Sequence, residues 1–344
     1  MTRKTALVIA PGRGTYNKEE LGYFGRYHAD KADLLTGFDA RRAALGQETL
    51  SALDGAAKYA LSTYSRGDNA SGLIYACAYA DFLSIDRDAY DIVAVTGNSM
   101  GWYIALACAG ALDARGGFEV VNTMGTLMHE GMIGGQTLYP FVDDNWVEIP
   151  GKRQELLALV DDIDGLHVSI ELGGMIVFAG DDAALKEAEG RLPPVQERFP
   201  MRLANHAGFH SSMQAPISAK GKAALDAAMF SDPALPLIDG RGHVWHPRAT
   251  DVGAMWDYTL GHQVVETYDF TRAIQNGMRE FAPDTVIVLG PGATLGGAVM
   301  QSLIACGWRG MNSKEQFLDQ QASAPAVISM GIDSQRGLAV SDSV

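Results

Sequence analysis

Short apolar runs alternate with longer amphipathic segments along most of the chain. Runs of apolar residues predict strands at 5–10, 92–95 and 285–289. Apolar positions at helical spacing predict helices at 71–83, 117–130 and 295–305, and a longer helical region at 33–64. Alternating strands and helices favour an α/β fold, in which helices flank a mostly parallel sheet.

The pattern changes between residues 135 and 203. Strands are expected at 138–142, 167–170, 175–179 and 201–203, with helices at 152–160 and 185–192. Asp181 and Asp182 stand where the second of these helices begins and are typical helix caps. A compact insertion of this kind resembles a ferredoxin-like subdomain. We therefore expect a large hydrolase-like α/β core formed by residues 1–130 and 202–344, and a small ferredoxin-like subdomain at 131–201.

One segment combines a strand, a sharp turn and a helix around a serine. Residues 91–112 read DIVAVTGNSMGWYIALACAGAL, with Ser99 at the turn. Glycines two residues before and two residues after Ser99 allow a tight bend, which would lift the hydroxyl clear of the sheet. The first amides of the following helix would then face an oxygen beside that hydroxyl. This geometry suits a nucleophile that attacks a carbonyl group.

Composition and charge narrow the classes of function. The 344 residues are 47% hydrophobic and 20% charged, as is usual for a globular α/β protein. A net charge of −14 argues against general binding of nucleic acid or of anionic membranes. No apolar run is long enough to span a bilayer, and the N-terminal run is too short for a signal peptide, so a cytoplasmic location is expected. The three cysteines lack metal-ligand spacing and are expected to be reduced, buried thiols.

A nucleophilic serine needs a base, and one of the eight histidines stands out. Residues 205–213 read NHAGFHSSM and follow the strand expected at 201–203, so His210 would lie near the ligand-binding edge of the sheet. Any of the other histidines, taken alone, is more typical of a surface or structural position. His243 and His246 flank Trp245 without a carboxylate or cysteine at ligand spacing, so we expect a loop there and no metal site.

Four ordered blocks carry a family resemblance: PGRG at 11–14, GNSMG at 97–101, NHAGFHSSM at 205–213 and LGPG at 289–292. Together with the insertion, they resemble the malonyl-CoA:acyl carrier protein transacylases and polyketide-synthase acyltransferases over residues 5–305. The resemblance implies an acyltransferase that acts on coenzyme A thioesters and an acyl carrier protein, without a permanently bound cofactor. It implies Ser99 as the nucleophile and His210 as the general base, acting through an acyl-enzyme.

The same resemblance implies two supporting features of the site. The backbone amides of Met100 and Arg13 would form the oxyanion hole. A backbone carbonyl, rather than a carboxylate, would orient the histidine. The segment 263–270 resembles the region that provides this carbonyl, which we place near Asp269.

Three departures from the family pattern concern the substrate pocket. Asn98 stands where the family has a histidine, and Trp102 stands where it has an acid and could reshape the pocket. Met124 occupies the position of the arginine that pairs with the malonyl carboxylate. A methionine cannot pair with a carboxylate, so an acyl group without one is expected. Arg13, which replaces a glutamine, could still reach a substrate carboxylate or the phosphates of coenzyme A.

Three alternative functions remain open at this stage. Water could attack the same acyl-enzyme, which would make the protein a hydrolase that clears acyl carrier proteins. An esterase with a serine–acid–histidine triad would need a carboxylate from Asp161, Asp162 or Asp164. The departures at Asn98, Trp102 and Arg13 are also compatible with a non-catalytic carrier-binding homologue.

Overall fold

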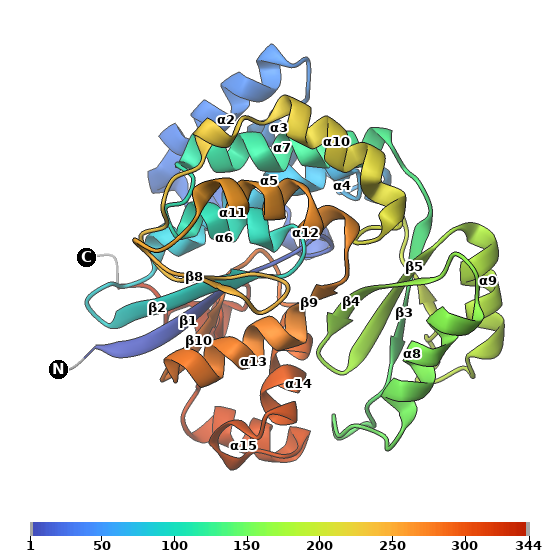
Figure 1. The fold of residues 1–344 in the computed structure, drawn as a ribbon. Coiled ribbons are helices and arrows are strands. Elements are labelled where there is room, and N and C mark those ends of the chain that lie inside the picture. The colour runs from blue at the N-terminus through green and yellow to red at the C-terminus, as the bar shows by residue number, and fades with distance from the viewer. Residues whose placement is uncertain (1–2, 342–344) are drawn as a thin grey trace.

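A computed structural model describes residues 3–341, which contain two β-sheets with helices packed around them (Figure 1). The larger sheet has the strand order β11-β10-β1-β2-β7-β8. Its neighbouring strands run parallel, except for the antiparallel pair β7 and β8. The bounds are β1 (Lys4–Ala10), β2 (Tyr90–Gly97), β7 (Leu237–Ile238), β8 (Val244–Trp245), β10 (Thr285–Val288) and β11 (Val327–Ser329).

The central strands are buried on both faces, which explains their continuous apolar runs. The last five residues of β1 and all of β10 are buried. Helices α6 (Gly101–Cys108) and α13 (Phe270–Phe281) pack on opposite sides of β1 and β2 (Figure 1). Beyond α6, the long helices α5 (Gly67–Ser84) and α7 (Ala114–Glu130) pack against each other.

The smaller sheet has the strand order β6-β3-β5-β4-β9. Its first four strands alternate with two helices in the chain order β3 (Gly135–Pro140), α8 (Lys152–Asp162), β4 (His167–Leu172), β5 (Met175–Gly180), α9 (Asp182–Arg191) and β6 (Met201–Arg202). This βαββαβ arrangement is ferredoxin-like. The edge strand β9 (Tyr268–Asp269) pairs in parallel with β4, so a segment beyond the expected insertion completes the sheet. The predicted fold class, a mostly parallel α/β core with an added small subdomain, is confirmed.

The helical region expected at 33–64 is broken into three helices, so that prediction is wrong in its continuity. The structure has α2 (Ala32–Ala44), α3 (Leu50–Asp54) and α4 (Leu61–Tyr64). Gly46 has a φ of 70° in the first break, and Gly55 caps the end of α3. The break after α3 matters for the site, because it brings α4 to the edge of the cleft described below.

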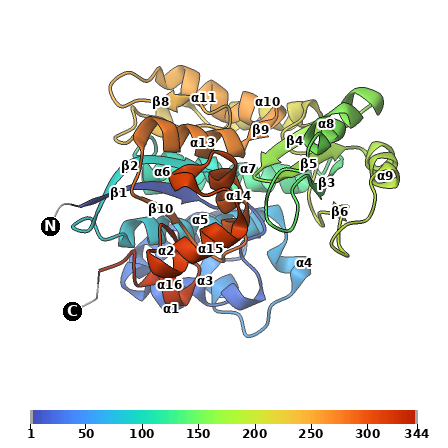
Figure 2. The ribbon, with the colours of Figure 1, turned by 90° about the horizontal axis from the view of Figure 1, so that it is seen from below.

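The other α-helices lie mainly in the C-terminal half. Among them, α16 lies beside the N-terminal helix α1 (Figure 2). Their bounds are α1 (Tyr23–Tyr27), α10 (Ala215–Ala224), α11 (Val252–Leu260), α12 (His262–Val265), α14 (Gly296–Ala305), α15 (Lys314–Ser323) and α16 (Asp333–Arg336).

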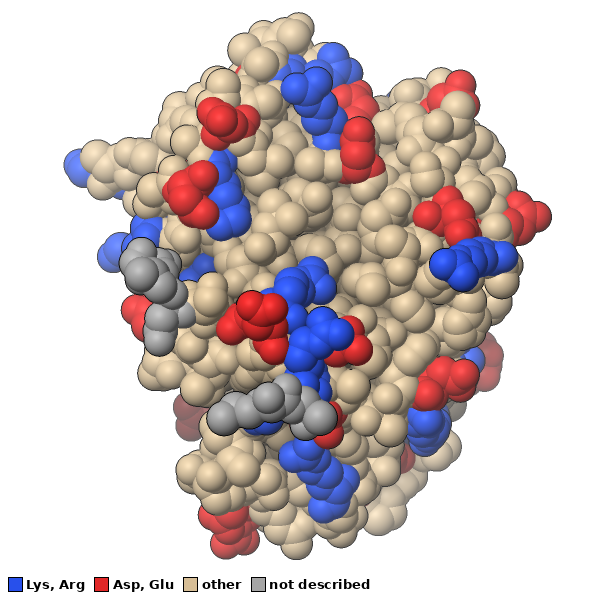
Figure 3. Space-filling model, turned by 90° about the vertical axis from the view of Figure 1, so that its left-hand side faces the viewer, with Lys and Arg blue, Asp and Glu red and all other residues tan. Residues whose placement is uncertain are grey.

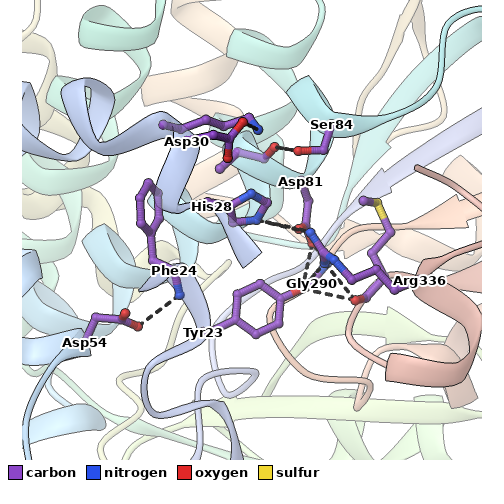
Figure 4. Close-up of polar contacts among 12 residues, drawn as sticks. Tyr23, Phe24, His28, Asp30, Asp54, Asp81, Ser84, Gly290 and Arg336 are labelled. Carbon is purple, nitrogen blue, oxygen red and sulfur yellow. Dashed lines mark hydrogen bonds and ion pairs between the residues drawn. The ribbon is translucent and has the colours of Figure 1, made fainter. Parts of the chain in front are cut away.

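A buried polar network fixes α16 to the rest of the core (Figure 4). Asp81 of α5 accepts hydrogen bonds from His28 at 2.8 Å, from the Tyr23 hydroxyl at 2.8 Å and from the Gly290 amide at 2.7 Å. Arg336 of α16 forms an ion pair with the same carboxylate at 2.7 Å. The LGPG block therefore serves the core, as a turn that leads into α14 and whose first glycine binds Asp81.

The surface carries mixed charges. On the face seen in Figure 3, acidic and basic side chains stand side by side rather than in separate fields. Within residues 3–341, no helix is both long enough and apolar enough to cross a membrane. Cys77, Cys108 and Cys306 are free thiols, and the first two are buried.

Candidate active site

Ser99 lies at the apex of a strained turn between β2 and α6. Its φ is 55°, in the left-handed region, which side chains with a Cβ rarely adopt. A Cβ on Gly97 would lie 2.2 Å from the Gly101 backbone, and one on Gly101 would lie 2.4 Å from the Ala10 carbonyl. Both glycines are therefore required by close backbone contacts, and the turn holds the serine hydroxyl at the carboxyl end of the central strands.

The structure brings Ser99 and His210 together from positions 111 residues apart. The Ser99 Oγ lies 2.7 Å from the His210 Nε2. On the other side of the ring, Nδ1 lies 2.6 Å from the backbone carbonyl of Gln263. A carbonyl can only accept, so Nδ1 carries the proton and Nε2 of the neutral ring accepts from the serine hydroxyl. This is the arrangement that a general base requires.

Burial keeps this imidazole neutral. His210 is 3% exposed. Burial lowers the pKa of His210 to about 4, although the hydrogen bond to the Gln263 carbonyl acts in the opposite direction. At neutral pH the ring therefore has a free lone pair facing Ser99.

Gln263 supports both members of the pair. Its backbone carbonyl orients His210, and its side-chain Nε2 donates to the Ser99 carbonyl at 3.1 Å. The Tyr103 hydroxyl donates to Gln263 Oε1 at 2.9 Å, which fixes the orientation of the amide. Tyr268 places its ring against His210 and donates its hydroxyl to the Gly97 carbonyl below the turn. These roles of Gln263, Tyr103 and Tyr268 were not predicted from the sequence, although Gln263 and Tyr268 both lie in the segment 263–270.

Asp269 does not provide the orienting carbonyl, so that expectation is wrong. Its side chain caps α13 by accepting from the Arg272 amide at 2.8 Å. It lines a different cavity, which also contains Arg153 and Glu171. The physical reason is that α12 ends between the two positions, so the histidine meets the backbone six residues earlier, at Gln263.

Two residues beside the elbow have backbone amides without a protein acceptor in the described part of the chain. Within residues 3–341, no hydrogen bond is made by the amides of Met100 and Arg13. Met100 is the N-cap of α6, and both residues line the cavity that contains Ser99. The PGRG turn lies directly against the elbow, since a Cβ on Gly12 would be 2.7 Å from the Asn98 carbonyl. The oxyanion hole at Met100 and Arg13 stays a prediction.

The cavity beside Ser99 has a largely uncharged wall. Arg13 is the only lysine or arginine among the described residues that line it. Its Nη2 donates to the carbonyls of Ser65 at 2.8 Å and Asn205 at 3.2 Å, while its Nε is buried without a partner within residues 3–341. The remaining wall is formed by Ser71, Tyr103, Gly125, Met128, Phe209 and Val264, together with Met100, His210 and Gln263.

Trp102 and Met124 do not line this cavity, which corrects two expectations. Trp102 is fully buried behind the elbow, where its indole donates to Thr259 Oγ1 at 2.9 Å. Met124 is also fully buried and packs against α10, where a Cβ on Gly221 would lie 2.7 Å from its sulfur. Successive residues of a helix differ in direction by about 100°, so neighbouring positions on α7 face the cavity instead. These positions are Gly125 and Met128.

Asn98 faces a second, larger cleft rather than the cavity of Ser99. This cleft runs between the two sheets, and its lining includes Leu172 and Met175 of the smaller unit and Leu295 of the larger. The Asn98 Oδ1 is buried without a hydrogen-bond partner in the described part of the chain. Arg13 also lines this cleft, so its side chain stands where the cleft meets the serine cavity.

The described residues offer no acid for a triad and no metal site. Both ring nitrogens of His210 are occupied, by Ser99 and by the Gln263 carbonyl. Asp161, Asp162 and Asp164 lie at and just after the end of α8 in the smaller unit, so the triad of the esterase alternative is not formed. No group of three or more histidine, cysteine, aspartate or glutamate side chains is placed to bind a metal ion within residues 3–341.

Sequence comparisons with known proteins support the resemblance that the motifs indicate. No family model matches the chain. Among curated proteins, the chain is 23% identical over 236 residues to the malonyl CoA-acyl carrier protein transacylase of Haemophilus influenzae. The aligned region covers 65% of this chain and 72% of the relative. The predicted resemblance to the transacylases is thereby confirmed.

Solved structures show the same fold. The malonyl-CoA:ACP transacylase of Synechocystis sp. PCC 6803 superposes with a TM-score of 0.74 at 18% identity, covering 96% of this chain and 98% of that one. The malonyl-CoA:acyl carrier protein transacylase of Xanthomonas oryzae superposes with a TM-score of 0.72 at 17% identity, covering 98% of this chain and 97% of that one. A malonyl-transacylase solved in complex with its type II polyketide-synthase acyl carrier protein superposes with a TM-score of 0.66 at 17% identity, covering 87% of this chain and 93% of that one. The chain therefore has the transacylase fold.

Proposed function

We propose that this protein transfers an acyl group from a coenzyme A thioester to the thiol of an acyl carrier protein, through an ester on Ser99. The observation that carries the proposal is the hydrogen-bonded chain from Ser99 through His210 to the Gln263 carbonyl. The sequence relative and the structural neighbours, which are named as transacylases, support the same chemistry. One neighbour was solved with its acyl carrier protein, which supports the choice of acceptor.

The residues supply a balanced two-step reaction. His210 Nε2 takes the proton of Ser99 while the serine oxygen bonds to the thioester carbon, and the amides of Met100 and Arg13 would stabilise the oxyanion. The carbon–sulfur bond then breaks, and the departing coenzyme A sulfur takes the proton from His210. In the second step, the carrier thiol gives its proton to His210 and attacks the ester, and Ser99 leaves with that proton.

We further propose that the acyl group lacks a carboxylate. The wall of the serine cavity is largely uncharged, and the one arginine in it already donates to two backbone carbonyls. Among the described residues, the only charged partner for a malonyl carboxylate in this cavity would be the remaining N–H groups of Arg13, whose Nη2 is already bound, and a carboxylate left unpaired there is costly. Acetyl or a longer apolar group avoids that cost.

A competition experiment tests this function. The enzyme is given acetyl-CoA, malonyl-CoA and holo-acyl carrier protein, and the acylated carrier is analysed by mass spectrometry. We expect acetyl carrier to form faster than malonyl carrier. Faster malonyl transfer would overturn the proposed acyl class, and release of free acid at the same rate with and without carrier would identify a hydrolase instead.

A further inference from the structure

A third cavity lies next to the serine cavity and is lined by a stack of tyrosines. The rings of Tyr16 and Tyr64 are parallel with centroids 5.8 Å apart, and those of Tyr64 and Tyr59 follow at 4.6 Å. Ile74 of α5 and Leu203, which follows β6, extend the apolar wall. This tyrosine cavity lies beside the break between α3 and α4, a region that the sequence predicts as continuous helix.

The hydroxyls of Tyr16 and Tyr64 are already bound within the protein. Tyr16 donates its hydroxyl to Asp54 at 2.6 Å, and Tyr64 donates its hydroxyl to the Leu53 carbonyl at 2.7 Å. Both side chains are 3% exposed. Ring surface is therefore what these two residues present to the cavity, and ring surface favours apolar or aromatic groups.

Arg13 separates the tyrosine cavity from the serine cavity. Among residues 3–341, it is the single residue that lines both. Its two hydrogen bonds to the Ser65 and Asn205 carbonyls hold it across the gap between α4 and the segment after β6. Asn205 Nδ2 also donates to Ser65 Oγ at 2.6 Å, which joins the same two segments directly. The guanidinium packs against the ring of Phe209.

We infer that Arg13 is the residue that sets the length of the acyl chain, because its side chain closes a passage from Ser99 into the tyrosine cavity. An apolar chain that passed this point would have to displace a guanidinium whose Nη2 is bonded to two backbone carbonyls. Short acyl groups fit in front of it. When the Arg13 side chain is removed, the two cavities join, and a longer apolar acyl chain extends over the tyrosine rings. This inference rests on the proposed acyl transfer and defines its substrate class more narrowly.

Arg13→Ala tests the inference without changing the backbone amide that would serve the oxyanion hole. Transfer from acetyl-, butyryl- and octanoyl-CoA is measured for both proteins as kcat/KM. We expect the ratio of octanoyl to acetyl transfer to rise by roughly tenfold or more, because a pocket that accepts several further methylenes gains at least that much discrimination. Adding Ile74→Phe, which refills the tyrosine cavity, should reverse the rise.

Ser65→Ala is the matched control. It removes the bond between Ser65 and Asn205 but leaves the guanidinium and the Ser65 carbonyl in place. The ratio should stay at the wild-type value. If Ser65→Ala raises the ratio as much as Arg13→Ala does, loosening of the two segments explains the effect and the inference is overturned. An unchanged ratio in Arg13→Ala, with acetyl transfer retained, overturns it too.

A binding measurement separates this inference from the proposed reaction. In a Ser99→Ala background, calorimetry gives the Kd of octanoyl-CoA with and without Arg13→Ala. We expect roughly tenfold tighter binding when the arginine is absent. Tighter binding, together with a wild-type enzyme that transfers no acyl group, would support the inference about the cavity and refute acyl transfer. Unchanged affinity would refute only the inference about Arg13.

Discussion

Two buried histidines in this protein have opposite surroundings. His28 donates to an aspartate that also binds an arginine, a tyrosine and a backbone amide, deep in the core (Figure 4). His210 has a serine hydroxyl on one side and a backbone carbonyl on the other, and it lines a cavity. Both rings are almost completely buried, at 0% and 3% exposure.

The difference shows that the hydrogen-bond partners of a buried histidine decide whether it has a structural or a chemical role. At His28, an aspartate and an arginine neutralise each other, and the network stabilises the core. At His210, no charged partner contacts the ring among the described residues, so the imidazole stays neutral and can take a proton. The weak dipole of a carbonyl orients the ring without raising its pKa far, which suits a base that must work at neutral pH.

Replacing each histidine by alanine should test the difference between their roles most clearly. His210→Ala should lower kcat/KM for acyl transfer by about 10²–10⁴-fold, because the serine loses its base. His28→Ala should leave kcat/KM near the wild-type value and lower the free energy of unfolding instead. Steady-state transfer assays and urea unfolding of both variants measure the two effects. Equal losses of activity in two folded variants would contradict the separate roles.

Asp81→Ala should cost the most stability. Arg336 would remain buried without its counter-ion, and loss of one partner from a buried pair costs about 3–5 kcal/mol in the free energy of unfolding. Asp30→Ala is the matched control, because Asp30 pairs with Lys31 on the surface and should change stability by about 0.5 kcal/mol or less. A similar, small loss in both variants would show that the buried network is dispensable.

The pH profile should separate His210 from an ordinary histidine. Its pKa is lowered to about 4 by burial, so the neutral base is present from alkaline pH down to roughly pH 5 and is lost as the pH falls through 4. The rate of Ser99 acylation should follow that curve, with circular dichroism confirming that the protein stays folded. A midpoint near the usual histidine pKa of about 6.5 would contradict the burial argument.

Tyr103→Phe should have the smallest effect of these changes. The Gln263 Oε1 would lose its donor inside the core, at a cost of about 1–3 kcal/mol in unfolding free energy and a modest fall in kcat. Tyr79→Phe is a suitable control, because the Tyr79 hydroxyl has no protein partner within residues 3–341. If the two variants are equally stable, Gln263 is held in place without Tyr103.

The features that could be predicted from the sequence are those encoded within short segments. The elbow around Ser99 needs only a strand, two glycines and a helix, and all stand within 91–112. The βαββαβ order of the smaller sheet was readable because each strand and helix has its own apolar pattern. Gly46 and Gly55 were also visible as breakers, and giving them more weight would have divided the region at 33–64.

The residues that could not be predicted depend on contacts between distant segments. Gln263 meets His210 across 53 positions, and Tyr103 meets Gln263 across 160. Position in an alignment also does not give the direction of a side chain. Met124 stands where the family places an arginine, yet it points to α10, whereas Met128 one turn later faces the cavity.

The most direct test of the central claim is the intact mass of the protein after brief incubation with acetyl-CoA. The wild type should gain the mass of one acetyl group on Ser99, and Ser99→Ala should gain none. An acetyl group that remains bound to Ser99→Ala, or its complete absence from correctly folded wild type given short-chain thioesters, would contradict the claim that Ser99 and His210 form the reacting pair.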